Sequence, residues 1–536
     1  MSIVEQKGRL SGSTIRLYRK GQAGDGAGVS AQAGTVGGVK AANQVVLAAL
    51  ALGGCVDLLF YGKAPGISVL LFVGLVLGAL FWYARREQAR IAWRNLWLLV
   101  PLFFFAAMVA VRDSDMLTTL NICAVAGLLL LVVGFFAEGR VEQLGLLGYP
   151  LALARAAKGL LVQPRPLAAD IRKSAVTNRS GIRRAGEIVR GILLAVPLLL
   201  LFTFLLSSAD SVFQGYVNKV FQARFLDDAP EVGFRLGIIL LAAWMAAGAL
   251  LYGAGRRNRA SSISSGAATA KLTARSRGLG FVEAGLVLGL VNTLFAAFSW
   301  IQFTVLFSGQ AARTMGFEEY REYVRRGFGE LLVVAVLTMI LILGLRRAVR
   351  RVTEDQERNL KVLNSIMIVL ALVMLVSAFE RMVVWEGIQF YINTTTRIVV
   401  RTFIVWLGLL FGWLFLTGLL RRDRFAIGAF IALLGFLATI NIVNPDADVA
   451  AYNIGRNDEL STRYLYLLSD DAIPALAAGL QTVDYPQRNE LREYLRYRLH
   501  DMERDESVQD WPSFNLARLQ ARETLARLRD AGEILP

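Results

Sequence analysis

The side chains of this chain that could do chemistry are arginines, carboxylates and tyrosines at the ends of apolar stretches. One candidate cluster consists of Arg326, Glu330, Arg381, Tyr391, Arg397, Asn444, Asp446, Tyr452 and Asn453. A guanidinium group matches a phosphate through two parallel hydrogen bonds, so these arginines could bind an anion. Alternatively, they form ion pairs with nearby carboxylates that hold helices to a neighbouring domain. We favour ion pairs, because the acids are numerous enough to neutralise the arginines.

Four more polar residues interrupt apolar stretches: Asp57, Glu283, Asn292 and Gln302. A charge at the centre of a bilayer costs at least about 2.5 to 3.5 kcal/mol, so each of the two acids should face a partner or water. Either acid could couple transport to a proton or an ion, although structural pairing or simple exposure to the lipid headgroups is favoured. Neutral polar side chains within spans more often bond between neighbouring helices than line a cavity.

Composition excludes several kinds of chemistry. The chain has one histidine and two cysteines, and Cys55 and Cys123 both lie in apolar stretches. Histidine-based metal sites, proton relays and disulfide frameworks are therefore not expected. The sequence carries no recognisable catalytic motif, so we expect no cofactor and favour a protein that is not an enzyme.

Four aspartates, Asp446, Asp448, Asp470 and Asp471, raise the question of a divalent cation, since carboxylate oxygens suit calcium or magnesium. Their spacing fits no EF-hand loop, so we expect no metal site. Ser469 precedes Asp470 directly before an apolar helix at 472–480, and an N-cap is the favoured role there.

Eleven apolar stretches must position these residues. A bilayer core of about 30 Å needs roughly 20 apolar residues in a helix, and these stretches are too long for barrel strands. They cover 44–61, 66–83, 96–111, 117–136, 190–207, 236–253, 281–307, 329–345, 362–379, 400–420 and 425–443. The expected fold class is therefore all-α, a polytopic bundle of transmembrane helices.

The distribution of charge predicts the orientation of this bundle. Alternate loops sum to about +24 and the remaining loops to about −6, as expected when Lys and Arg stay on the cytoplasmic side. Asp57 and Glu283 within the spans bring the total to the net charge of +16. The N-terminus is then inside and the C-terminus outside. The arm 1–43 should be disordered, and 137–189 and 254–280 are basic cytoplasmic loops. This charge pattern argues against nucleic-acid binding, because the basic residues are scattered over separate loops.

The C-terminal region, 444–536, reads as a small extracytoplasmic domain of helices at 459–468, 471–480, 488–505 and 513–529. In the last helix, Phe514, Leu516, Leu519, Ala521 and Leu525 form the predicted apolar stripe. So few short helices bury little core alone. We expect the domain to dock on the outer ends of the spans through residues that include Tyr464, Leu465, Leu468 and Trp511.

Short polar signatures attached to the apolar stretches carry a resemblance to a known family. They include Ser-Ala-Asp-Ser-Val-Phe at 208–213, Tyr-Val-Arg-Arg-Gly-Phe-Gly-Glu-Leu at 323–331, Asn-Pro-Asp-Ala at 444–447 and Trp-Pro-Ser-Phe-Asn-Leu-Ala-Arg at 511–518. Their order resembles the DUF4153 and DUF4173 group of bacterial polytopic membrane proteins of unknown function, over most of the chain. The resemblance implies a membrane protein but brings no catalytic residue and no ligand. At 391–397 this chain lacks a glycine of the family pattern.

Two functions are compatible with this organisation in a bacterial cytoplasmic (inner) membrane. The first is transport or handling of a substrate at the outer leaflet, such as an anionic lipid-linked envelope precursor. The second is a membrane-anchored sensor or scaffold that binds a protein partner through the outer helical domain. A polar cavity around Asp57, Glu283 or Asn292 would favour transport, whereas a solid bundle under the outer domain would favour the second function.

Overall fold

The computed structural model describes residues 35–166, 229–254, 279–302, 317–349, 353–387, 394–419, 424–455, 462–505, 507 and 510–534. Over these residues the chain is helical, and its strand pairing is a single isolated bridge between Leu279 and Val349. The chain divides into two units, residues 1–44 and 45–536, and the contacts described below lie within the second unit. The expected all-α fold class is confirmed.

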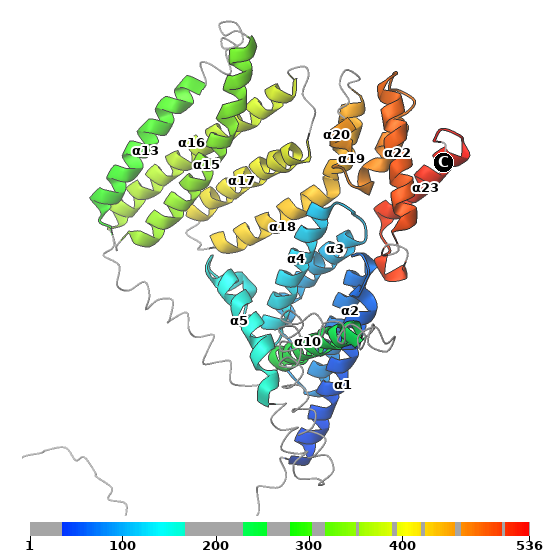
Figure 1. The fold of residues 1–536 in the computed structure, drawn as a ribbon. Helices are drawn as coiled ribbons and strands as arrows, with labels where there is room; N and C mark the ends of the chain where they lie inside the picture. The colour runs from blue at the N-terminus through cyan, green and yellow to red at the C-terminus, as the bar shows by residue number, and fades with distance from the viewer. Residues whose placement is uncertain are drawn as a thin grey trace, which may run out of the picture. The chain divides into compact units, whose positions relative to one another are not determined.

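One group of helices packs around a first hydrophobic core. It contains α1 (Thr35–Phe60), α2 (Ile67–Arg86), the 3-10 helix η1 (Trp93–Leu98), α3 (Leu99–Val109), α4 (Asp115–Gly134), α5 (Gly148–Val162) and α10 (Ala229–Ala254) (Figure 1). Leu80, Leu102 and Phe105 are among its fully buried side chains. Helix α1 begins at Thr35, inside the arm 1–43 for which the sequence predicts disorder.

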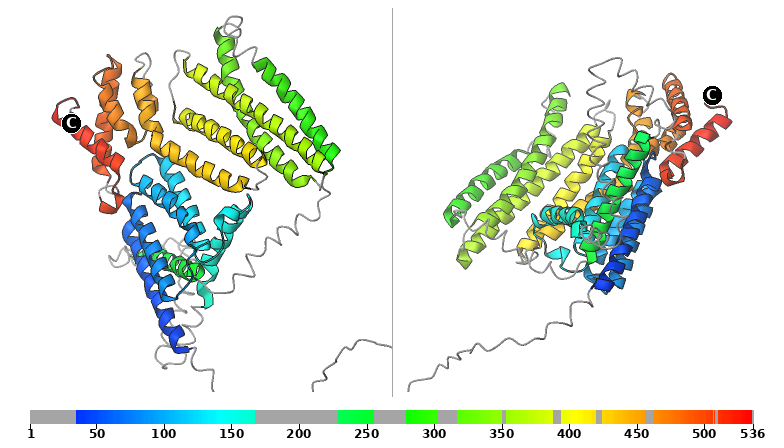
Figure 2. Two further views of the ribbon diagram at one scale, coloured as in Figure 1. Left: turned by 180° about the vertical axis from the view of Figure 1, so that it is seen from behind. Right: turned by 60° about the horizontal axis from the view of Figure 1, so that its bottom comes forward.

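A second group packs around its own core. It consists of α13 (Phe281–Gln302), α15 (Phe317–Ala348), α16 (Glu354–Gly387) and α17 (Thr395–Leu419). Helix α18 (Phe425–Val443) joins the two groups, since Phe425 lies in the second core and Leu437 and Ile440 lie in the first. Figure 2 shows α18 from behind, between α17 and the helices of the first group.

The C-terminal helices surround a third core. They are α19 (Pro445–Ile454), α20 (Thr462–Leu465), the 3-10 helix η4 (Asp470–Ala472), α21 (Ile473–Gly479), α22 (Gln487–Arg504), the 3-10 helix η6 (Trp511–Ser513) and α23 (Leu516–Asp530). Asn444 separates α18 from α19 in the left-handed conformation, with φ of 54°, and Pro445 begins the next helix, where its missing N–H costs nothing. Ile398 of α17 completes this core.

The buried face of α23 differs from the predicted stripe. Ala517, Ala521 and Leu525 are buried, whereas Phe514, Leu516 and Leu519 are exposed. The expected stripe mixed two faces of α23, because Leu516 and Leu519 lie on the exposed face and Ala521 and Leu525 on the buried one, while Phe514 precedes the helix. Residues four apart in a helix share a face, and this periodicity runs through the three buried residues.

Eight described helices are long and apolar enough to cross a membrane, and two shorter apolar helices cover Gln44–Phe60 and Trp93–Val109. The expected stretch at 190–207 lies outside the described residues, as do 167–189 and 255–278 of the predicted basic loops. Helix α13 exposes Val282, Leu286, Leu290 and Leu294 by 62% to 75%. An apolar row of this kind at four-residue spacing suits contact with lipid rather than water.

Candidate functional site

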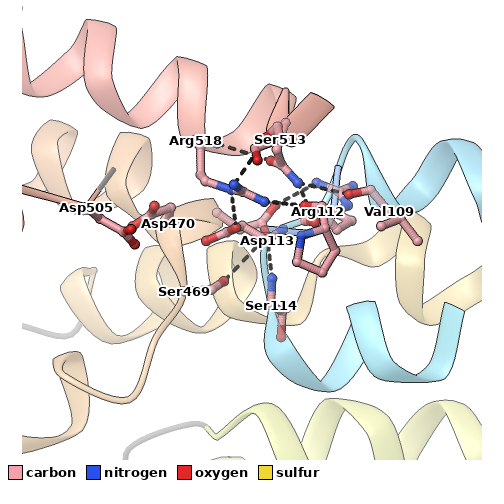
Figure 3. Close-up of polar contacts among 12 residues, drawn as sticks. Val109, Arg112, Asp113, Ser114, Ser469, Asp470, Asp505, Ser513 and Arg518 are labelled. Carbon is pink, nitrogen blue, oxygen red and sulfur yellow. Dashed lines mark hydrogen bonds and ion pairs between the residues drawn. The ribbon is translucent and has the colours of Figure 1, made fainter. Parts of the chain in front are cut away.

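The C-terminal helices meet the membrane-length helices at the turn between α3 and α4 (Figure 3). The last carbonyl groups of α3 need partners from outside the helix. Asn515 donates from Nδ2 to the carbonyls of Val109 at 3.0 Å and Arg112 at 2.8 Å, and the amide of Leu516 donates to the Ala110 carbonyl at 2.7 Å. Asn515 also caps α23, so one side chain ends α3 and starts α23.

The carboxylate of Asp471 lies next to the beginning of α4. Its Oδ2 accepts hydrogen bonds from the amides of Asp113 at 2.7 Å and Ser114 at 3.3 Å, while its Oδ1 faces Nη1 of Arg112 at 3.3 Å. A carboxylate at the N-terminus of a helix satisfies free amides and complements the helix dipole. The N-cap role expected for Asp470 is wrong, because neither η4 nor α21 has a side-chain cap and Asp470 is paired with Arg498 instead.

Arg518 ties three remote segments together. It donates from Nε to Oδ1 of Asp113 at 2.7 Å, from Nη1 to the Ser513 carbonyl at 3.2 Å and from Nη2 to the Pro65 carbonyl at 2.5 Å. The α1–α2 turn, the α3–α4 turn and α23 are thereby held by one largely buried guanidinium group. Below, the carboxylate junction denotes the set Arg112, Asp113, Asp470, Asp471, Asn515 and Arg518.

A polar cavity of about 250 Å³ opens beside the carboxylate junction. Asp470 in its wall is paired with Arg498, which also reaches Asp501 at 2.9 Å. Asp115 and Asp505 also line the cavity, so acidic side chains outnumber basic ones among the described residues of its wall. Among the described residues, no group of three or more His, Cys, Asp or Glu could hold a metal ion.

Burial controls the protonation of the junction. Desolvation, helped by the neighbouring charges of Asp470 and Asp471, raises the pKa of Asp113 to about 7 against the opposing effect of Arg518. Burial also raises the pKa of Asp471, although its amide donors and Arg112 oppose this. Asp113 can therefore change its charge near neutral pH, at the contact between the C-terminal helices and the α3–α4 turn.

One member of the predicted cluster, Asp446, lies where the C-terminal helices contact α17. Asp446 is buried at the start of α19, where it accepts hydrogen bonds from Thr395 Oγ1 at 2.8 Å and Ser469 Oγ at 2.6 Å. Tyr464 belongs to the same group, since its hydroxyl accepts the amide of Thr395. Asp446 thus joins the start of α17 to the C-terminal helices through hydroxyl groups.

The other members of the cluster are spread over several helices. Glu330 is exposed on α15, Arg381 is buried on α16, and Arg397 is half-buried in the first turn of α17. Asn444 lies at the α18–α19 break. Tyr452 and Asn453 follow on α19. The side chain of Arg326 and the whole of Tyr391 lie outside the described residues.

The intramembrane acids both have partners in the protein. Asp57 accepts two hydrogen bonds from Arg235, at 3.0 Å from Nε and 2.7 Å from Nη2. Glu283 is exposed, and its Oε2 accepts the amide of Gly280 at the start of α13. Asp57 thus has a charged partner, whereas Glu283 is exposed and bonds within its own segment.

The neutral polar residues link helices. Asn292 donates to the carbonyl of Leu363, which connects α13 with α16 at 2.9 Å. Asn121 and Asn441 are fully buried and exchange hydrogen bonds of 2.8 Å and 2.9 Å between α4 and α18. The side chain of Gln302 lies outside the described residues.

Sequence reasoning missed the arginines of the carboxylate junction. The sequence shows Arg112 and Asp113 only as charges of a short loop between two apolar stretches, and Arg518 only as the end of the signature at 511–518. The available signal was the position of the pair directly after an apolar stretch, where a charge must find a partner or leave the membrane. The expected docking residues Leu465 and Leu468 are buried in the third core, whereas Trp511 is 61% exposed.

The fold and these contacts place the chain among multi-pass integral membrane proteins. A family model described as "Domain of unknown function (DUF4153)" matches residues 99–479, and the chain belongs to this family. The match contains Arg112, Asp113 and Asp471 but ends before Arg518. No curated protein and no solved structure matches the chain.

Proposed function

We propose that this protein is a membrane-anchored sensor of conditions at the outer surface of a bacterial cytoplasmic membrane. The carboxylate junction, between the C-terminal helices and the α3–α4 turn, receives the signal and passes it to the membrane helices. The contact of Arg518 with both Pro65 and Asp113 carries this proposal, because one side chain links the C-terminal helices to two turns between membrane helices. Basic loops on the cytoplasmic side, assigned by the positive-inside rule, are the proposed output.

The contacts of the intramembrane residues support a sensor more than a transporter. Asp57, Glu283 and Asn292 each bond to a group of the protein itself, whereas transport would be favoured by an open polar cavity around them. Handling of an anionic lipid-linked precursor would need arginines that converge on one accessible face. Arg381 is buried, which favours a structural role for it.

Protonation of Asp113 is the proposed input. The acid stands between Asp470, Asp471 and Arg518, so its charge decides whether the carboxylates repel one another across the junction. Protonated Asp113 relieves this repulsion, and the C-terminal helices then hold the α3–α4 turn closely. Loss of the proton as the pH rises through about 7 loosens the contact.

A distance measurement tests this proposal. Spin labels are attached at the exposed positions Met116 on α4 and Tyr497 on α22, in a full-length chain in which Cys55 and Cys123 are replaced. We expect the distance distribution to broaden as the pH is raised through neutrality, and to be independent of pH in Asp113→Asn. A distribution that stays unchanged in the parent chain would contradict a sensor that works through this junction.

A further inference from the structure

A groove of about 860 Å³ lies between α16 and α17, at the end of α17 remote from the C-terminal helices. Arg346, in the last turn of α15, forms part of its rim. Ligand pockets of proteins commonly measure roughly 300 to 1,000 Å³, so the groove is large enough for a substantial part of a lipid molecule. Its residues played no part in the proposals above.

The two parts of the groove differ in chemistry. In the part of the rim that the structure describes, the basic side chains are Arg346, Arg358 and Lys361, and the acidic ones are Glu354, Asp355 and Glu357. Below the rim the wall is apolar, with Val362, Ile366 and Val369 from α16 and Phe415 from α17. A charged rim above an apolar wall matches a molecule with a charged head and a hydrocarbon tail.

The apolar wall continues along the membrane. Val362, Ile366, Val369, Val373 and Val376 follow one another at three and four residues on α16, and all are exposed. Such spacing places them in one row along the helix. A bilayer core contains no water to fill a groove between helices, so an acyl chain is the natural occupant of this row.

The ion pairs at the rim are weak enough for a charged ligand to replace one partner of each pair. Lys361 pairs with Glu357 at 2.5 Å and Arg358 with Asp355 at 3.5 Å, within one turn of α16 and with substantial exposure to solvent. Surface pairs of this kind contribute about 0 to 1 kcal/mol. A phosphate can therefore take over the basic groups while a cation of the same ligand takes over the acids.

We propose that the α16–α17 groove binds a zwitterionic phospholipid with a primary ammonium headgroup, of the phosphatidylethanolamine type. Among the described residues of the rim, basic and acidic groups are equal in number, which complements a headgroup that carries both charges. A primary ammonium donates hydrogen bonds to carboxylates, whereas a quaternary choline has no N–H and is commonly bound in an aromatic cage. Phe415 is the one aromatic residue among those that line the groove. This inference does not depend on the proposed sensor function.

Gly418, near the end of α17, makes room for the guanidinium group of Arg346. A Cβ atom at this position would lie 2.7 Å from Nη2 of Arg346, so the absence of a side chain lets the guanidinium group lie across the end of α17. Arg346 can thereby reach into the rim from α15. Arg347, its neighbour in sequence, is also exposed but does not line the groove, and it serves as a matched control.

The test measures which lipid stays bound to the full-length protein. The protein is reconstituted in nanodiscs with equal parts of phosphatidylethanolamine, phosphatidylglycerol and phosphatidylcholine, extracted, and examined by native mass spectrometry. We expect enrichment of phosphatidylethanolamine over the other two lipids. The triple variant Glu354→Gln, Asp355→Asn, Glu357→Gln should lose about tenfold in this preference and favour phosphatidylglycerol, because only the phosphate-binding groups remain.

Two further variants keep the test decisive. Val369→Trp should fill the apolar wall and lower the binding of all three phospholipids, whereas Arg347→Ala should bind as the parent chain does. Binding of phosphatidylglycerol or phosphatidylcholine in preference by the parent chain would overturn the proposal. Equal binding of all three lipids, or an unchanged preference in the triple variant with unaltered thermal stability, would overturn it as well.

Discussion

The two ends of α17 use charge in opposite ways. At its beginning, Thr395 contacts the buried carboxylate of Asp446, next to the third core and the C-terminal helices. At its other end, the rim of the α16–α17 groove carries ion pairs that are exposed and lie within one turn of helix. Buried polar groups joined across distant segments hold the fold, because removal of one partner leaves the other desolvated. Exposed local pairs cost little to break and are free to take up ligands.

The largest effect is expected at the carboxylate junction. Arg518→Ala leaves Asp113 without its guanidinium partner and also removes donors from two backbone carbonyls. We expect a loss of about 3 kcal/mol in stability, the size seen when one member of a buried pair is removed. Thermal melting of the full-length chain in detergent measures it. Arg529→Ala is the control, since its exposed pairs with Glu503 and Asp530 should contribute less than about 1 kcal/mol.

A smaller effect is expected for the amide pair of Asn121 and Asn441. Replacement of one asparagine by leucine leaves the other buried amide with an unmade bond and should cost about 1 to 2 kcal/mol. The double variant with two leucines should recover part of this loss, because no polar group is then stranded. If the loss in the double variant equals the sum of the two single losses, the double-mutant cycle would show that the pair contributes no coupling.

A more gradual effect is expected from pH. The pKa of Asp113 lies above its ordinary value in the folded chain, at about 7, so folding favours the protonated form. Its contribution to stability is fully present below the unfolded pKa and is lost as the pH rises through about 7. Melting temperatures of the parent chain should fall across this range, and those of Asp113→Asn should fall less. A parent chain whose melting temperature rises from mildly acidic to mildly alkaline pH would reverse the sign and refute this account of Asp113.

The smallest effect on stability is expected at the groove rim. Lys361→Ala removes an exposed pair within one turn of α16, and the loss should stay below about 0.5 kcal/mol. The same variant should weaken retention of phosphatidylethanolamine. A large destabilisation would erase the difference between the two ends of α17.

The fold could be predicted from the sequence because it follows from local patterns. The stretch predicted at 425–443 coincides with α18, and the one predicted from 281 begins with α13. Hydropathy over some twenty residues is enough to define such helices. Likewise, the requirement of a partner for Asp57 follows from the cost of a charge in the membrane, although the identity of Arg235 does not.

The carboxylate junction could not be predicted in the same way. Asp471 accepts a hydrogen bond from the amide of Asp113, 358 residues away, and Arg518 lies 405 residues from Asp113. No local spacing relates such residues, so the sequence predicts for the acids of 470–471 only a role at the start of their own helix. The lengths of the spans decide which turns share a side, and only packing decides which side chains on that side meet.

The C-terminal helices show the same dependence on packing. Val449 and Ala450 of α19 and Ile398 of α17 belong to the third core, so a fragment that starts at Asn457 lacks part of it. We expect this fragment to melt broadly, since short helices draw most of their stability from tertiary contacts. A fragment from Pro445 should melt more cooperatively, and circular dichroism on both fragments checks this.

The most direct test of the central claim is the coupling between the C-terminal helices and the α3–α4 turn. Deuterium exchange followed by mass spectrometry on the full-length chain reports on the amides of Asp113 and Ser114, which donate hydrogen bonds to Asp471. We predict that Arg518→Ala speeds exchange in the α3–α4 turn as well as in α23, while Arg529→Ala changes neither. Faster exchange confined to α23, with the turn as protected as in the parent chain, would contradict transmission through the carboxylate junction.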